Sequence, residues 1–137
     1  MENYFEVQMS VEELNQMSPS AIAHCGDAVF ELLVRSSLCL HGGVRNGKLH
    51  KDTVSQVKAT AQAKRAEKLL PLLSEQELAW FKHGRNCHMH GAPKSANAVE
   101  YAKATGVECL FGALFLTGQR ARANELFIKS AEDEDGV

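Results

Sequence analysis

The sequence contains little that would place the chain in a membrane or in an oxidising compartment. No apolar run approaches the length of a membrane span, and the first residues, MENYFEVQMS, lack the basic and apolar stretches of a secretory signal. The four cysteines, Cys25, Cys39, Cys87 and Cys109, form no CxxC pair. We therefore expect a cytoplasmic protein without a membrane-spanning segment, in which the cysteines are reduced thiols and mostly buried.

Strand signals are nearly absent as well, because no long segment alternates apolar and polar residues. Helix signals recur instead, including capping boxes that begin at Ser10 and Ser74 and a proline, Pro19, suited to the first turn of a helix. They predict an all-α fold with helices over residues 11–17, 19–40, 48–70, 74–83, 96–104, 107–116 and 119–131, a loop over 84–95 and a bend at Gly106. We expect one domain over residues 1–137, with flexible ends at 1–10 and 132–137.

Apolar residues at helical spacing predict which side of each long helix faces inward. In the helix over 19–40 these residues are Ile22, Val29, Leu32 and Leu33. In the helix over 48–70 they are Val54, Val57, Ala61 and Leu69.

Charge is distributed unevenly, although the net charge is only −2. Residues 1–43 carry one basic and six acidic side chains, residues 44–103 eleven basic and five acidic, and residues 104–137 three basic and six acidic. A basic middle segment is typical of a surface that faces a polyanion, and equally of a solvated helix surface rich in lysine. The charge pattern alone leaves both interpretations open.

Two carboxylates lie in strongly apolar segments. Asp27 is part of AIAHCGDAVFELLV and Glu108 is part of GVECLFGALFL. A charge among apolar neighbours is costly unless it is paired, hydrogen-bonded or bound to a metal. Small residues nearby, Gly26 and Gly112, would let two helices approach closely and bring the two carboxylates together, which suits a Mg²⁺ site.

Other interpretations of these residues stay open. Both carboxylates could be solvated residues of a helix surface, or they could pair with Arg35 and Lys103. His24, Asp27 and Glu31 share one helical stripe and could form a metal set, although Glu31 fits better as a structural acceptor that supports the site from outside the metal shell.

Two further patterns are weak. Cys87, His88 and His90 could bind a transition metal, but no second cluster lies at zinc-finger spacing. Nucleophilic catalysis by Cys25 has no support, because nothing in the sequence indicates an exposed thiol of lowered pKa.

Longer motifs resemble a known family. The segment IAHCGDAVFELLVR resembles the signature helix of the ribonuclease III family, with GDA at its centre. The segment HGRNCHMHGAPKSANAVEYAKATGVECLFGALFLTG resembles the loop and second catalytic helix of the Mini-ribonuclease III branch, and KATAQAKRAEKLLPLLSEQE resembles its middle helices. The resemblance covers about residues 18–131.

The resemblance implies a helical bundle like the ribonuclease III endonuclease domain, which dimerises and cleaves double-stranded RNA with Mg²⁺. It implies that Asp27 is the catalytic carboxylate and that Glu108 is its metal-binding partner, and that products carry 5′-phosphate ends. The branch is associated with maturation of the large-subunit (23S) ribosomal RNA precursor. Larger ribonucleases III have two more carboxylates, at positions that hold Ala23 and Thr105 here.

If the chain acts on double-stranded RNA, basic and polar residues of the middle segment would contact phosphates and 2′-hydroxyls. Our candidates for these contacts are Lys48, His50, Lys51, Lys58, Arg85, Asn86 and Lys94. We expect a homodimer whose contact includes Ile22, Val29 and Phe30. The alternatives are a non-catalytic double-stranded-RNA-binding or ribosome-assembly module on the same fold, and a helical adaptor that binds other proteins.

Overall fold

The chain folds into helices packed around one central helix. A computed structural model describes residues 1–41, 46–87 and 96–131, and in these residues the regular structure is helical, without a strand. The helices are α1 (Val11–Asn15), α2 (Pro19–His41), α3 (Asn46–Val57), α4 (Ala59–Leu69), the short 3₁₀ helix η1 (Leu70–Leu72), α5 (Glu75–Asn86), α6 (Ala96–Leu116) and α7 (Arg120–Ala131). The predicted all-α fold is confirmed. No helix in the described part of the chain is both long and apolar enough to cross a membrane.

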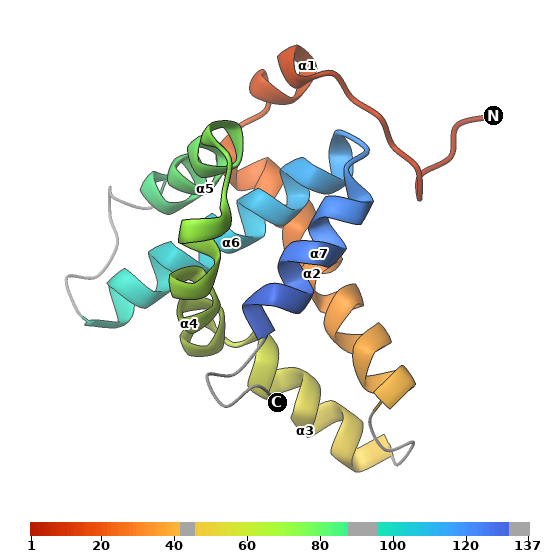
Figure 1. Cartoon of the computed structure of the whole chain (residues 1–137), viewed down its shortest axis with the longest axis vertical. Coiled ribbons are helices and arrows are strands. Elements are labelled where there is room, and N and C mark those ends of the chain that lie inside the picture. The colour runs from red at the N-terminus through yellow and green to blue at the C-terminus, as the bar shows by residue number, and fades with distance from the viewer. Residues whose placement is uncertain (42–45, 88–95, 132–137) are drawn as a thin grey trace.

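The most apolar helix, α6, lies at the centre of the bundle. It packs against α2, α4, α5 and α7, and Figure 1 shows it passing between α4 and α5 on one side and α2 and α7 on the other. From residue 104 to residue 114 every residue except Glu108 is buried. A helix that is apolar on all sides is stable only when neighbours surround it, so its composition explains its position.

Local signals set several helix ends as expected. Ser10 and Ser74 each accept a hydrogen bond from the backbone N–H of a glutamate three residues later, and each glutamate side chain accepts from the serine backbone in return. Pro19 is the first residue of α2, and the Ser18 hydroxyl accepts a hydrogen bond from the Ala21 N–H at 3.2 Å. These contacts satisfy amide groups that lack partners within the helix.

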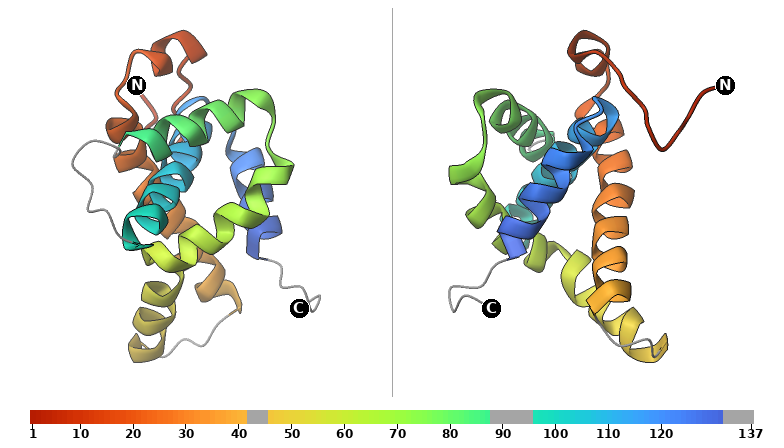
Figure 2. Two further views of the ribbon diagram at one scale, coloured as in Figure 1. Left: turned by 90° about the vertical axis from the view of Figure 1, so that its left-hand side faces the viewer. Right: turned by 45° about the vertical axis from the view of Figure 1, so that its right-hand side comes forward.

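The predicted continuous helix over residues 48–70 is wrong, because the chain breaks at Lys58. Lys58 has extended backbone angles, φ −66° and ψ 154°, and separates α3 from α4. The two helices pack on different partners, α3 on α2 and α4 on α6, and Figure 2 shows their axes diverging. Apolar spacing along the chain does not reveal such a change of partner.

Two other helix predictions are also wrong. Gly106 does not divide the segment into two helices, since α6 runs through it, and a Cβ atom at this position would lie 2.7 Å from the Phe81 ring. The glycine therefore permits close packing of α5 on α6. In addition, α5 extends to Asn86, three residues beyond the predicted end, so Arg85 and Asn86 lie in its last turn.

Some predicted core residues are exposed. Leu32 and Val54 keep 55% and 47% of their surface accessible, while the buried residues of α2 are Ile22, Ala23, Gly26, Phe30 and Val34. Ile22 and Phe30 belong to the chain's own core, so the expected dimer contact through them is wrong. Of the four thiols only Cys109 is buried, whereas Cys39 is exposed, so the expectation of mostly buried cysteines is wrong too.

Candidate active site

Two glycines let α2 and α6 cross at very short range. A Cβ atom on Gly26 would lie 1.6 Å from the Glu108 carbonyl oxygen, and one on Gly112 would lie 2.2 Å from the Ile22 carbonyl oxygen. Any larger residue at either position would push the helices apart. The backbone contact holds the turn of α2 that carries Asp27 directly against the turn of α6 that carries Glu108.

The side chains of Asp27 and Glu108 meet at this crossing. Glu108 is half-buried, while Asp27 is exposed at the surface. Burial raises the pKa of the Glu108 carboxyl group to about 8, and its hydrogen bond to Asp27 and the negative charge of Asp27 add to the rise. Two carboxylates so close favour a state in which a proton, or a cation, lies between them.

The two basic residues considered as ion-pair partners of these carboxylates, Arg35 and Lys103, pair with other residues. Arg35 pairs with Glu31 at 3.1 Å, one turn away on the same helix, and Lys103 pairs with Glu67 of α4. Among the residues that the structure describes, no basic side chain forms an ion pair with Asp27 or Glu108. The two carboxylates are therefore neither isolated surface charges nor members of the salt bridges considered from the sequence.

A third side chain reaches this site from α4. Gln62 is 2% exposed, and its Nε2 donates to the Val57 carbonyl at 2.7 Å. Its side chain lies near enough to Glu108 to oppose the rise in the pKa of that carboxyl group. Its Oε1 is buried and has no hydrogen-bond partner in the described part of the chain. Sequence reasoning missed Gln62, because the sequence gives no local sign that this polar residue faces another helix.

A buried arginine fixes the helix that carries Gln62. Arg65 lies against the rings of Phe30 and Phe127, with its guanidinium carbon 5.1 Å and 4.3 Å from the ring centroids. It donates to the Phe127 carbonyl and to the Ser130 hydroxyl, both at 2.8 Å. Desolvation lowers its pKa to about 10, so it stays charged at neutral pH. These contacts tie α4 to α2 and α7.

The donor set at the crossing fits a hard divalent cation. The two carboxyl groups are oxygen ligands of the kind that Mg²⁺ prefers, and the buried Gln62 Oε1, which has no donor in the described part of the chain, is a further oxygen acceptor on the neighbouring side chain. Within the described residues no group of three His, Cys, Asp or Glu side chains could hold a metal ion. His24 is exposed and Glu31 pairs with Arg35, so the helical stripe through them does not form such a group.

The weaker cysteine patterns gain nothing from the structure. Cys87 is half-buried, and its Sγ donates to the Gly84 carbonyl at 3.1 Å; His88 and His90 lie outside the described residues. Burial raises the pKa of Cys25, which disfavours the thiolate that a nucleophile requires.

The RNA-contact candidates lie on three elements. His50 and Lys51 are exposed on α3, Lys58 is exposed at the joint before α4, and Arg85 donates to Asn86 at 3.2 Å at the end of α5. Lys94 and the side chain of Lys48 lie outside the described part. None of the described candidates has a contact with the Asp27–Glu108 pair.

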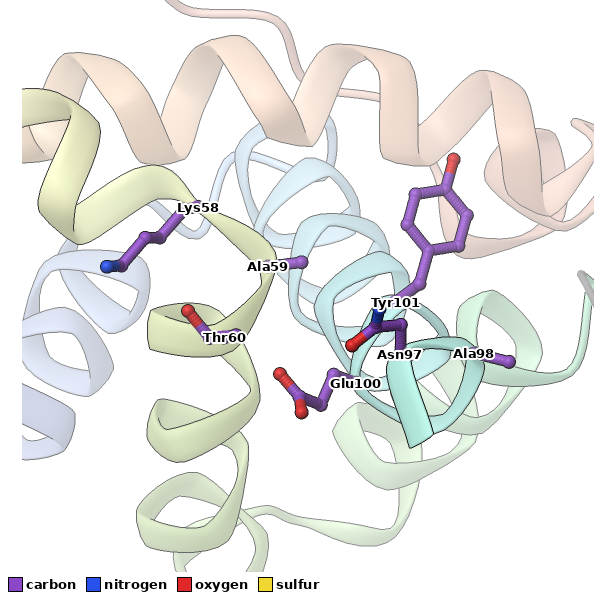
Figure 3. A pocket seen from close by; sticks show the side chains of 7 residues that line it. All are labelled: Lys58, Ala59, Thr60, Asn97, Ala98, Glu100 and Tyr101. Carbon is purple, nitrogen blue, oxygen red and sulfur yellow. The ribbon is translucent and has the colours of Figure 1, made fainter. Parts of the chain in front are cut away.

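A pocket of about 540 Å³ opens between the start of α4 and the start of α6. Figure 3 shows Lys58 directing its ammonium group away from the α6 side chains, while the carboxylate of Glu100 faces α4. The acidic group of Glu100 makes this pocket unfavourable for phosphate.

The comparisons with known proteins agree with this architecture. Residues 20–119 match the model of the ribonuclease III domain. The chain belongs to the ribonuclease III family, in its Mini-ribonuclease III branch. A Mini-ribonuclease 3 of Symbiobacterium thermophilum is 44% identical over 116 residues, which are 85% of this chain and 89% of the relative. One from a Thermoanaerobacter species is 35% identical over 124 residues, covering 90% and 87%.

The fold is also similar to a solved structure. A crystal structure of a Fusobacterium nucleatum protein superposes with a TM-score of 0.74 at 26% identity, over 85% of this chain and 93% of that one. The ribonuclease III domain and the relatives together establish the reaction class, so the chain is an endoribonuclease.

Proposed function

We propose that the chain is a Mg²⁺-dependent homodimer that cleaves double-stranded RNA, with Asp27 and Glu108 as its catalytic carboxylates. The observation that carries the proposal is the contact of these two carboxyl groups at a glycine-lined helix crossing, on the fold of an endoribonuclease family. Asp27 also lies at the motif position of the family's signature helix, and Glu108 at the motif position of its second catalytic helix.

The protein groups have separate tasks in this proposal. Asp27 is exposed and presents its carboxylate to the substrate side, while half-buried Glu108 is held by Gln62 and by the helix crossing. A divalent cation bound by these carboxylates would supply Lewis-acid polarisation of the scissile phosphodiester and activation of the attacking water. Cleavage of the bond to the 3′-oxygen leaves a 5′-phosphate and a 3′-hydroxyl.

Double-stranded RNA is the substrate that best suits the basic and polar residues of α3, of α5 and of the joint before α4. His50, Lys51, Lys58, Arg85 and Asn86 present cationic and polar groups that contact phosphates and 2′-hydroxyls, and Lys48 and Lys94 join them in the proposal. A-form RNA is recognised mainly by shape through such contacts. By analogy with the Mini branch, the natural substrate is the 23S ribosomal RNA precursor in the cytoplasm.

A homodimer would place two sites on the two strands of a duplex. The exposed face of α2 beside Asp27, with Ala21, His24, Ala28 and Leu32, is a better contact than the buried residues expected from the sequence. In a twofold contact this face meets its own copy. Light scattering at micromolar concentration should give twice the mass of the chain, and a monomer would exclude the dimer.

The test uses a long RNA duplex, its separated strands, and either Mg²⁺ or EDTA. We expect the duplex to be cut with Mg²⁺, to stay intact in EDTA, and to be preferred over the single strands. A duplex that is bound but intact with Mg²⁺ would support the non-catalytic RNA-binding or ribosome-assembly module. Absence of any interaction would support the protein adaptor.

A further inference from the structure

The side chain of Gln62 is held at two points beside the carboxylate pair. Its Nε2 donates to the Val57 carbonyl at the joint between α3 and α4, at 2.7 Å. Since Nε2 carries two hydrogens, the second is available to the nearby Glu108 carboxyl group, whose pKa Gln62 lowers. The amide is thus oriented by the backbone break at Lys58 and in turn orients the Glu108 carboxyl group.

The Oε1 atom of Gln62 is the unexplained part of this arrangement. This atom is buried, in a residue that is only 2% exposed, and it accepts no hydrogen bond from the described residues. A buried acceptor without a donor is costly, so its persistence beside a functional site calls for a partner that the protein alone does not provide. Water molecules around a hydrated cation are such donors.

We infer that Gln62 is a positioning residue of the candidate metal site, which fixes Glu108 through Nε2 and accepts through Oε1 a hydrogen bond from the hydration shell of the cation. This inference rests on the proposed function. A neutral amide suits the task, because a lysine or arginine at this position would neutralise the carboxylates and compete with the cation. With two carboxylates in the site, water fills most of a Mg²⁺ shell, so its outer partners matter.

Mn²⁺ binding to RNA-free protein tests the inference without relying on cleavage. Free Mn²⁺ is followed by its paramagnetic resonance signal in wild type, Gln62→Met, Gln56→Met and Asp27→Asn. Methionine keeps the length of glutamine and removes both hydrogen-bonding atoms. Gln56 is a matched control, because its Oε1 accepts from Arg65 at 3.3 Å and it is not among the residues that shift the pKa of Glu108.

We expect Gln62→Met to weaken Mn²⁺ binding about 10- to 100-fold, the range for the loss of an outer partner of a metal site. Gln56→Met should bind as wild type does. In cleavage assays Gln62→Met should need a correspondingly higher metal concentration for half-maximal rate, with near-normal rate at saturation and unchanged RNA affinity in EDTA. Wild-type Mn²⁺ affinity in Gln62→Met, or an equal loss in Gln56→Met, would overturn the inference.

The variants separate this inference from the proposed function. If Asp27→Asn loses Mn²⁺ affinity and Gln62→Met does not, only the role of Gln62 is wrong. If Asp27→Asn binds as wild type does, the carboxylate site itself is wrong. Should Gln62→Met fail to fold, wild-type side-chain amide resonances decide: substoichiometric Mn²⁺ should broaden the Gln62 pair before the Gln56 pair, and the reverse order would refute the role.

Discussion

At the residue scale, the half-buried carboxyl group of Glu108 links the electrostatics of the folded chain to the proposed function. Desolvation and the nearby Asp27 raise its pKa to about 8, so the folded protein binds a proton there that the unfolded chain releases near its ordinary value. Neutral pH is close to the point at which the group ionises. Without a cation, the folded protein therefore keeps Glu108 largely protonated at neutral pH, and a bound cation would favour its ionised form.

This raised pKa predicts how stability depends on pH in the absence of divalent cations. Between the unfolded and folded pKa values of Glu108 the native state binds more protons, so stability should fall as pH rises from about 4.5 to about 8 and then level off. Glu108→Gln should remove this slope and be more stable than wild type above pH 8. Thermal melts in EDTA at several pH values check it, and identical slopes in both proteins would contradict the pKa.

The residues of the site differ in how visible they are in the sequence. Asp27 and Glu108 stand out because charges are rare in apolar helices. Gln62 does not, because an uncharged polar residue in an amphipathic helix gives no sign of whether it faces water or another helix. Its role depends on a carboxylate forty-six residues away, and local pattern does not carry that information.

At the element scale, the crossing of α2 and α6 is the feature that positions the site. Gly26→Ala would place a methyl group 1.6 Å from the Glu108 carbonyl oxygen, which backbone atoms cannot avoid without separation of the helices. We expect a loss of at least about 3 kcal/mol, the upper end for overpacking, together with loss of cleavage. Ser36→Thr adds a methyl group on the exposed side of α2 and should leave both stability and cleavage unchanged.

Chemical denaturation and cleavage assays of these two variants would make the comparison. A Gly26→Ala protein with wild-type stability would show that α2 and α6 do not meet through the glycine contact.

A second element-scale prediction concerns the ion pair between α5 and α7. Arg122 donates from Nε and Nη2 to the two carboxylate oxygens of buried Glu77, at 2.8 Å and 2.9 Å, and lowers the pKa of that group. Arg122→Ala should cost about 1.5–3 kcal/mol, the range for a hydrogen bond to a charged group. Glu125→Gln removes only its exposed partner and should cost less than about 1 kcal/mol.

Urea titrations of the two variants measure this difference. Equal losses would mean that burial of Glu77 does not strengthen the pair. Cleavage per folded molecule should stay at the wild-type level in both, because neither residue contacts Asp27 or Glu108.

Helix ends show which parts of the fold the sequence determines locally. The capping boxes at Ser10 and Ser74 involve four residues each and were predicted correctly. The break at Lys58 and the continuity of α6 through Gly106 were not, because each depends on a packing partner distant in the chain. Local signals therefore predicted the fold class and most helices, while helix directions required tertiary contacts.

At the scale of the whole molecule, the basic middle segment is the part of the chain that forms α3, α4, α5 and the start of α6. The acidic termini contribute α2, α7 and the second half of α6, with the carboxylate pair at the α2–α6 crossing. The proposed RNA-contact residues and the proposed catalytic carboxylates thus come from different segments of the chain.

Salt dependence tests the proposed RNA surface. Arg85→Ala and Lys51→Ala should each weaken binding of all duplex sequences alike and reduce the slope of log affinity against log salt by roughly one unit. Lys129→Ala, exposed on α7, is the control and should leave the slope unchanged. Because Arg85 lies in the last turn of α5, it could instead stabilise the helix end. In that case Arg85→Ala would lower the melting temperature with normal RNA affinity.

The central claim is that the Asp27–Glu108 pair cleaves double-stranded RNA, and its most direct test is Asp27→Asn. The substitution keeps the size of the side chain and removes its charge. With a duplex and saturating Mg²⁺, we predict a loss of cleavage of at least about 10²-fold, the scale for removal of one strongly interacting catalytic group, with wild-type stability and RNA affinity. Cleavage at a near-normal rate by Asp27→Asn would contradict the account.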